Sequence, residues 1–192
     1  MATTDSRKAG LLIPVETDAG DPEKVARLFV SGLTGLEPEM VRRRWTPKPL
    51  PRPGLSEDWA AVGIVNEVSE GTPATKHRDR GIDIATGGSS EVSVFQRLEF
   101  SAAFYGPHAQ QLADRFRIGA AVNQNQEWLK QFGLVLVSVR EHARRQPDLF
   151  GAVWADRYDV DFVLGRQLRR AFKVRSISNA DFEIYTERGK LE

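Results

Sequence analysis

Three aspartates, Asp156, Asp159 and Asp161, form the densest acidic group of the sequence. Asp159 and Asp161 are two residues apart in an alternating stretch, so the pattern places them on the same face of a strand. Such a pair could bind a divalent ion or act as an acid and a base. The sequence favours the other interpretation, a solvated strand face, because the Glu-x-Lys that a metal-dependent nuclease would also need is missing here.

The remaining candidate nucleophiles and ligands do not form a recognisable site. The three histidines, His77, His108 and His142, have neither the i, i+4 spacing of a helical metal site nor the i, i+2 spacing of a strand site. No serine lies in a G-x-S-x-G motif, and "ATGGSS" lacks the spacing and the lysine of a phosphate-binding loop. Cysteine is absent, which excludes disulfides, thiol catalysis and zinc sites built on cysteine. We therefore expect no catalytic residue, no cofactor and no metal.

Arginines gather in two groups and in one polar segment. Guanidinium groups pair well with phosphates and carboxylates, so these side chains could contact a nucleic-acid backbone. No aromatic platform or recognition helix accompanies them, and arginine is also enriched at protein–protein interfaces. We expect interface contacts from Arg42, Arg43, Arg44, Arg78, Arg80, Arg166, Arg169 and Arg170.

The composition is that of an ordinary soluble protein of 192 residues, with 41% hydrophobic and 28% charged residues. The net charge of +1 does not demand a nucleic-acid or membrane partner. The first residues, MATTDSRKAG, lack the apolar stretch of a signal peptide, and no apolar run approaches the ~20 residues of a membrane span. We expect synthesis in the cytoplasm.

Two periodic stretches dominate the expected secondary structure. Asp21 and Pro22 provide a helix cap and a first helical residue, and Gly32 or Gly35 can end that helix. Residues 92–105 alternate apolar and polar side chains and predict a long strand that is buried on one face. After Gly106 and Pro107 the period changes to that of a helix.

The other elements complete an α+β pattern. Residues 41–44 predict a short strand before a proline-rich loop, and residues 59–68 predict a central strand. We expect a short helix at 123–133, a buried strand at 134–142, a loop at 147–154 and an alternating strand from 156. Helices do not alternate regularly with strands, so we predict a mostly antiparallel sheet with helices on one face.

The expected organisation is an N-terminal arm at residues 1–20, a domain at 21–178 and a C-terminal tail at 179–192. Within the domain, residues 69–90 are polar and rich in Gly, Ser and Thr, which predicts a long flexible loop. We expect the arm and this loop to become ordered on neighbouring subunits.

The order of these elements resembles the bacteriophage neck terminator family, whose domain is similar to that of tail terminator proteins. The resemblance covers roughly residues 22–178 and is carried by "KPLPRPG", "AAVGIVN", "VSVFQRLEFSAAFYG", "PHAQQLADRF", "LKQFGLVLVSV" and "WADRYDVDFVLGRQ". The polar segment at 69–90 and the long arm depart from the simplest pattern.

The resemblance implies a structural virion protein without catalytic residues or cofactor. It implies a ring of six copies that ends the tail tube and joins it to the head connector. The expected partners are further copies of the chain, a tail tube or sheath protein, a connector or stopper protein, and DNA bound without sequence preference in the lumen. The alternatives are a head-completion or baseplate component of similar fold, or a metal-dependent DNA-processing enzyme.

Overall fold

The computed structural model describes residues 2–4, 10–15, 20–48, 51–78, 88–174, 185–186 and 189–190. The helices are α1 (Pro22–Thr34), the 3-10 turn η1 (Pro38–Met40), α2 (Ala109–Ala120) and α3 (Asn123–Lys130). The strands are β1 (Ala2–Thr3), β2 (Leu11–Leu12), β3 (Val41–Arg43), β4 (Trp59–Arg78), β5 (Gly88–Tyr105), β6 (Leu134–Val139), β7 (Arg144–Arg145), β8 (Asp148–Phe150), β9 (Val153–Ala155), β10 (Arg157–Val174), β11 (Tyr185–Thr186) and β12 (Gly189–Lys190).

The chain divides into two compact units. The first comprises Met1–Asp18, Pro73–Ser93 and Arg169–Glu192, and the second comprises Ala19–Thr72 and Val94–Leu168. Strands β4, β5 and β10 have residues in both units. This division differs from the expected arm, domain and tail, and whether residues 21–178 fold as one domain stays a prediction.

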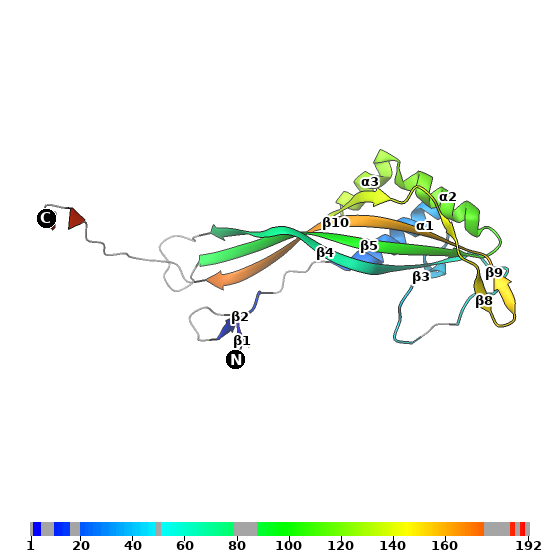
Figure 1. Ribbon diagram of the computed structural model, residues 1–192, viewed down its shortest axis with the longest axis horizontal. Coiled ribbons are helices and arrows are strands. Elements are labelled where there is room, and N and C mark those ends of the chain that lie inside the picture. Colours follow the sequence, from blue (N-terminus) through cyan, green and yellow to red (C-terminus); the bar gives the residue numbers. More distant parts are fainter. Residues whose placement is uncertain are drawn as a thin grey trace. The chain divides into compact units, whose positions relative to one another are not determined.

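The central sheet has the strand order β3-β4-β5-β10-β6, and β7 also pairs with β10 (Figure 1). Strands β3 and β4 are parallel, whereas β6 and β7 are antiparallel to β10. The sheet and its three α-helices make an α+β fold, as the sequence predicted.

The helices of the second unit pack on one face of the sheet. Side chains at even positions of β4, β5 and β10 share one buried cluster with side chains of all three helices. Phe100 of β5 stacks on Phe162 of β10 at 5.1 Å between ring centroids, and Phe116 of α2 meets the same Phe162 ring edge-on. Alternation along the strands therefore separates a helix-covered face from a second face. The expectation that residues 92–105 are buried on one face only was wrong at the end of β5, where Ser101, Ala103 and Tyr105 of the second face are also buried.

Helix α1 begins and ends where its sequence indicates. The Asp21 side chain accepts hydrogen bonds from the backbone N–H groups of Glu23 and Lys24, at 3.0 and 3.3 Å. Pro22 occupies the first helical position. The helix ends at Gly35, whose φ of +80° is left-handed, so the alternative ending at Gly32 was wrong.

The structure corrects several expected boundaries. The predicted loop at 69–90 is strand up to Arg78 and again from Gly88, whereas residues 79–87 lie outside the described residues. Strand β6 is an edge strand with exposed Val135 and Val137, not a buried strand. The loop expected at 147–154 contains the hairpin of β8 and β9, which meet in antiparallel register around Gly151.

The first unit contains several short pairings. Strands β1 and β2 form a parallel pair, and Val15 bridges Ala171 of β10 through an N–H···O bond of 2.8 Å. Strands β11 and β12 pair with each other. The described part of the expected N-terminal arm therefore includes paired backbone, and its ordering on a neighbouring subunit stays a prediction.

Candidate functional site

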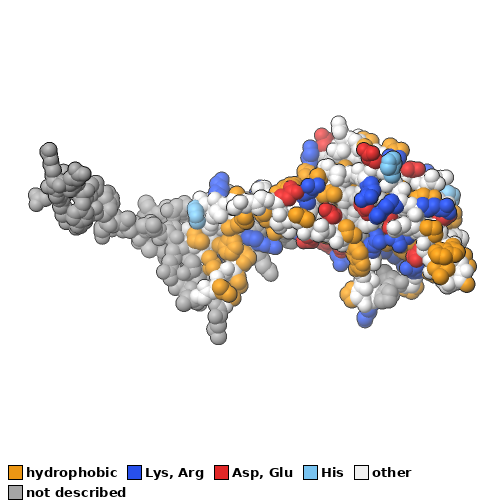
Figure 2. Space-filling view, in the orientation of Figure 1, with side chains coloured by type: hydrophobic (Ala, Val, Ile, Leu, Met, Phe, Trp, Pro, Cys, Tyr) orange, Lys and Arg blue, Asp and Glu red, His pale blue; other side chains and the backbone are white. Residues whose placement is uncertain are grey.

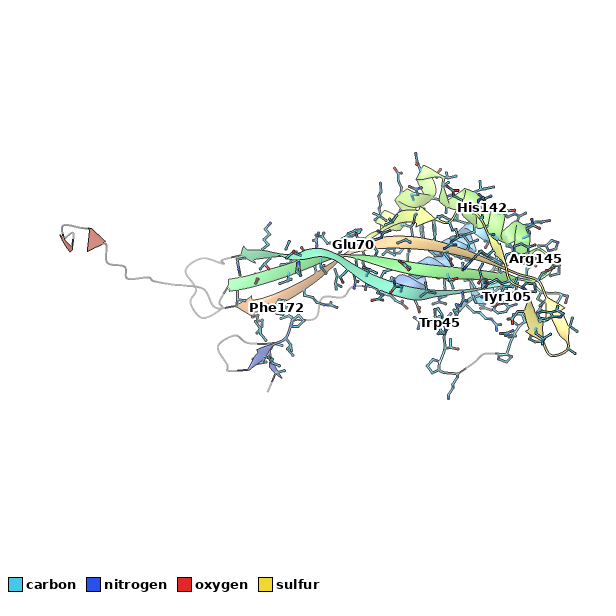
Figure 3. All side chains as sticks on the ribbon, in the orientation of Figure 1. Trp45, Glu70, Tyr105, His142, Arg145 and Phe172 are labelled. Atoms are coloured by element: carbon cyan, nitrogen blue, oxygen red, sulfur yellow. The ribbon has the colours of Figure 1, made fainter. Side chains whose placement is uncertain are left out.

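The sheet face opposite the helices carries a second apolar cluster at the end of β5. It consists of Trp59, Ala61, Ala103 and Tyr105, with Met40 packed beside it. The rings of Trp59 and Tyr105 stack with a centroid distance of 4.1 Å and an interplanar angle of 6°. Figure 3 labels Tyr105 near this end of the sheet. Met40, the last residue of the 3-10 turn η1, packs on this face, whereas α1, α2 and α3 contribute no residue to the cluster.

The turn between β5 and α2 is tied to the segment that precedes β4. Gly106 has a φ of +105°, and a Cβ atom there would lie 2.5 Å from both the Glu57 carbonyl oxygen and Asp58 Oδ1. Asp58 accepts a hydrogen bond of 2.9 Å from the backbone N–H of His108 and contacts its Nδ1 at 2.7 Å. The close approach requires glycine and fixes the proline-rich segment beside Tyr105.

A buried charge cluster lies next to the aromatic pair. Arg157 donates two hydrogen bonds to Asp159, of 2.7 and 2.6 Å, and its guanidinium lies 5.8 Å from the centre of the Tyr105 ring. Arg44 donates to Ser101 Oγ at 2.8 Å and approaches Asp159 within 4.0 Å. The hydrogen bonds to Asp159 raise the pKa of Arg157, and burial raises the pKa of the Tyr105 hydroxyl.

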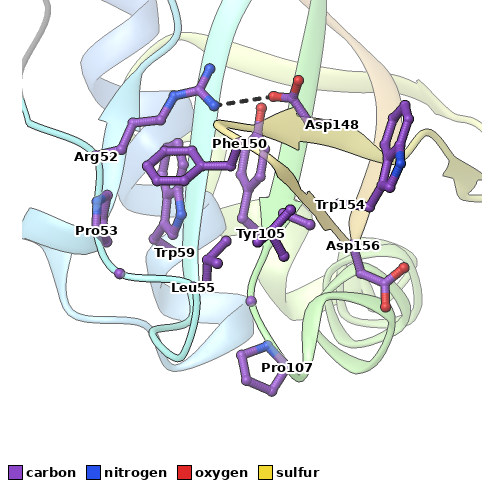
Figure 4. A pocket seen from close by; sticks show the side chains of 14 residues that line it. Arg52, Pro53, Leu55, Trp59, Tyr105, Pro107, Asp148, Phe150, Trp154 and Asp156 are labelled. Atoms are coloured by element: carbon purple, nitrogen blue, oxygen red, sulfur yellow. Dashed lines mark hydrogen bonds and ion pairs between the residues drawn. The ribbon is translucent and has the colours of Figure 1, made fainter.

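A pocket of about 200 Å³ lies between the proline-rich segment and the β8–β9 hairpin (Figure 4). Arg52 bridges the two sides: it pairs with Asp148 at 3.2 Å, and its guanidinium lies 5.7 Å from the centre of the Phe150 ring. The two acids of the pocket are both paired, Asp148 with Arg52 and Asp156 with Arg145 at 2.7 Å. Side chains that line the pocket include Arg52, Trp59, Tyr105, Asp148, Phe150 and Trp154. This arrangement suits apolar packing rather than proton transfer.

The hairpin itself exposes four large apolar side chains. Trp154 is 69% exposed, Leu149 and Val153 are each 53% exposed, and Phe150 is 38% exposed. Figure 2 shows hydrophobic side chains gathered over this hairpin. A contiguous patch of this kind is typical of a protein interaction site. We call residues 148–155 the apolar hairpin.

The acidic candidates are held by arginines. Asp159 is 1% exposed, so its assignment to a solvated strand face was wrong. Its charged neighbours are Arg157 and Arg44. Asp161 pairs with Arg140 at 3.3 Å and with Arg144 at 3.0 Å. Within the described ranges, no three His, Asp or Glu side chains gather into a group that could hold a metal ion.

The three histidines belong to different parts of the fold. His108 precedes α2 and contacts Asp58, whereas His77 is an exposed residue of β4. His142 is exposed between β6 and β7 and is labelled in Figure 3. The two histidines of the second unit therefore come from different connections, and His77 belongs to the first unit.

The predicted interface arginines fall into both units. Arg42 donates to the Pro51 carbonyl, Arg43 pairs with Asp21 and Glu23, and Arg166 donates to Gln96 at 2.9 Å. Arg169 of the first unit pairs with Glu91 at 3.8 Å. Arg170 also belongs to the first unit. Arg78 ends β4, its side chain lies outside the described part of the chain, and so does the whole of Arg80. Their role in an interface stays a prediction.

The apolar hairpin differs from the loop that the sequence predicts for "PDLFGAVW". A signal was present: the pairs Leu149–Phe150 and Val153–Trp154 are apolar or aromatic and are separated by two residues that begin with Gly151. Two such runs around a two-residue turn indicate a hairpin.

Comparison with known proteins is consistent with these observations. A search of curated proteins gave no match. Among the described helices, none is both long enough and apolar enough to cross a membrane. A family model described as phage neck terminator protein matches residues 23–189, which is far more than half of the 192-residue chain. The chain therefore belongs to the phage neck terminator family, a family of structural proteins of the phage neck and tail.

Proposed function

We propose that copies of this chain form a closed ring, a hexamer, at the head-proximal end of the phage tail. In this position the ring stops growth of the tail tube and joins the tail to a connector or stopper protein of the head. Assembly takes place in the host cytoplasm, before the head and the tail meet.

The observation that carries the proposal is the apolar hairpin, exposed on a member of a family of neck proteins. An isolated two-stranded hairpin is at best marginally stable in water, and large exposed apolar patches are uncommon on monomers. A protein that works as an isolated monomer would gain nothing from Trp154 and Leu149 in contact with solvent. Self-association or contact with a tail component would cover them.

The predicted arginines add polar contacts to this proposal. Arg43 and Arg169, whose side chains are 43% and 59% exposed, are accessible although each has an acidic neighbour. We propose that they contribute to the rim of interfaces with other copies or with the tube or sheath protein. DNA that passes through the lumen would be contacted without sequence preference.

A deletion of this gene in the phage tests the function. We expect tails of irregular and increased length that carry no head, because the tube end is no longer closed. Negative-stain electron microscopy of lysates measures both quantities, and a plasmid copy of the gene restores them. Tails of normal length joined to heads in the deletion strain would contradict the proposal.

A further inference from the structure

The outer face of the apolar hairpin has no partner among the described residues. Leu149 and Trp154 lie directly opposite each other in the β8–β9 register, so their side chains share one face. Phe150 lies beside Arg52 in the pocket, and Trp154, although it is 69% exposed, also lines part of that pocket. The pairs Arg52–Asp148 and Arg145–Asp156 fasten the hairpin to its own subunit. The hairpin therefore presents Leu149 and Trp154 outward as a small convex apolar surface.

A concave apolar surface lies elsewhere on the same unit, between α1 and α3. We call it the helix groove: it has a volume of about 460 Å³, and its apolar lining is Leu28, Phe29, Leu33 and Trp128. The rings of Phe29 and Trp128 are stacked in it with a centroid distance of 6.1 Å. Gly32 contributes no side chain to the wall of the groove, and a Cβ atom there would have no neighbour within 4 Å. The volume is in the range of pockets that hold large organic groups.

A carboxylate lies in the helix groove, and an exposed arginine lies beside Trp154 of the hairpin. Glu127 is the one charged residue among those that line the helix groove, and the described residues offer it no ion-pair partner. Beside the hairpin, Arg145 pairs with Asp156 and its side chain is 61% exposed, whereas Arg140 and Arg144 share Asp161. Arg145 lines the same surface hollow as Trp154. A Trp154 side chain that enters a groove would bring the exposed Arg145 toward Glu127.

We propose that the apolar hairpin of one copy inserts Trp154 and Leu149 into the helix groove of a second copy. The inference rests on the proposed ring. A ring of more than two copies needs a contact between two unlike surfaces of the same subunit, and the hairpin and the groove are such a pair. Two side chains cannot supply the ~800 Å² that each partner buries in a standard interface, so the hairpin is the anchor of a larger contact.

Three single variants of the full chain test the insertion. Trp154→Glu removes the anchor, and Leu28→Glu places a like charge near Glu127 in the groove. Ile118→Glu, on α2 and 62% exposed, is the matched control outside both surfaces. We expect at least about a tenfold weaker self-association for the first two variants and no change for the control. Native mass spectrometry over a concentration series measures the association, and circular dichroism confirms that each variant is folded.

Mixing the two defective variants gives a sharper result. The Leu28→Glu copy keeps its hairpin and the Trp154→Glu copy keeps its groove, so one compatible contact remains. We expect the mixture to stop at two subunits, one of each kind. A mixture that forms complete rings, or that stays monomeric, would overturn the unlike-surface contact.

Disulfide trapping provides a measurement that does not depend on loss of assembly. The chain contains no cysteine, so introduced thiols have no competitor. We expect a Trp154→Cys copy to cross-link with a Gln131→Cys copy, because Gln131 lines the groove. An Ile118→Cys copy replaces the second partner as the control. No cross-link above this control would overturn the insertion.

The failures of the two proposals are distinguishable. If the wild type and Trp154→Glu both form rings, the ring stands and the inference is wrong. If Trp154→Glu rings form but no longer bind purified tails, a tail protein occupies the hairpin and the inference is also wrong. A wild type that stays monomeric at every concentration and gives no cross-link would count against both.

Discussion

Asp159 is a buried acid that acts as the counter-ion of Arg157. Its side chain is 2% exposed and receives both hydrogen bonds of a bidentate arginine, whereas the Arg157 side chain is 17% exposed. Removing one partner of such a pair leaves a charge that is poorly solvated and uncompensated. Asp159, which the sequence suggested as a possible metal ligand or acid/base residue, therefore contributes to stability instead.

Asp159→Asn should lower the free energy of unfolding by about 3–5 kcal/mol, because Arg157 keeps its charge and loses its counter-ion. Asp156→Asn is the control: its pair with Arg145 is exposed on both sides, at 53% and 61%, and should change the free energy by at most about 1 kcal/mol. Urea unfolding of the three proteins measures both values. Equal effects of the two substitutions would show that the buried pair contributes no more to the free energy of unfolding than the exposed pair.

The raised pKa of Tyr105 predicts a loss of stability at alkaline pH. Burial raises the pKa of its hydroxyl above the usual value near 10. Between the unfolded and the folded pKa the unfolded state loses a proton that the folded state retains, so the free energy of unfolding falls as the pH rises above about 10. Tyr105→Phe should make this fall shallower. Urea unfolding from pH 8 to pH 11 compares the two proteins, and parallel curves would refute the assignment.

At the scale of elements, Phe100 tests the core between β5, β10 and the helices. Phe100 is fully buried and stacks on Phe162. Phe100→Ala should cost about 3–5 kcal/mol through lost apolar burial and a residual cavity. Val65→Ala on β4, where the side chain is 50% exposed, should stay within about 0.5 kcal/mol. Thermal and urea unfolding measure the difference, and a small loss for Phe100→Ala would mean that the core collapses around the gap.

The two glycines Gly106 and Gly32 should respond to alanine in opposite ways. At Gly106 a Cβ atom meets Glu57 and Asp58, and the φ of +105° is strained for any other residue, so Gly106→Ala should cost at least about 1–3 kcal/mol. At Gly32 the helix has open space, so Gly32→Ala should stabilise by about 0.5–1 kcal/mol. Melting temperatures that shift in opposite directions would support both assignments. A neutral Gly106→Ala would refute the close approach.

The sequence predicted those elements whose pattern is local. The Asp21 cap and the alternation along residues 92–105 were sufficient to place α1 and β5, because both signals depend on neighbours in the chain. The second half of β4 was missed for the opposite reason: residues 65–77 are exposed on both faces, so no apolar alternation marks the strand. Asp159 also approaches Arg44, which is distant in sequence, and no local pattern reports that contact.

At the scale of the whole molecule, the two kinds of predicted contact differ in their response to salt. Exposed arginine pairs weaken as ions screen them, whereas apolar burial does not. We expect self-association to change by less than about tenfold between 0.1 and 0.5 M NaCl, because Trp154 and Leu149 anchor it. Analytical ultracentrifugation at several salt concentrations measures the effect. A steep loss of association would assign the interface to the arginines instead.

The exposed hairpin also has a consequence for the protein before it reaches a particle. Newly made subunits already expose the apolar surface of Trp154 to solvent, before any tail end is present. At high concentration they would adhere to one another indiscriminately or precipitate. If the chain acts at the tail end as proposed, overproduction of this one chain should reduce the yield of infectious particles.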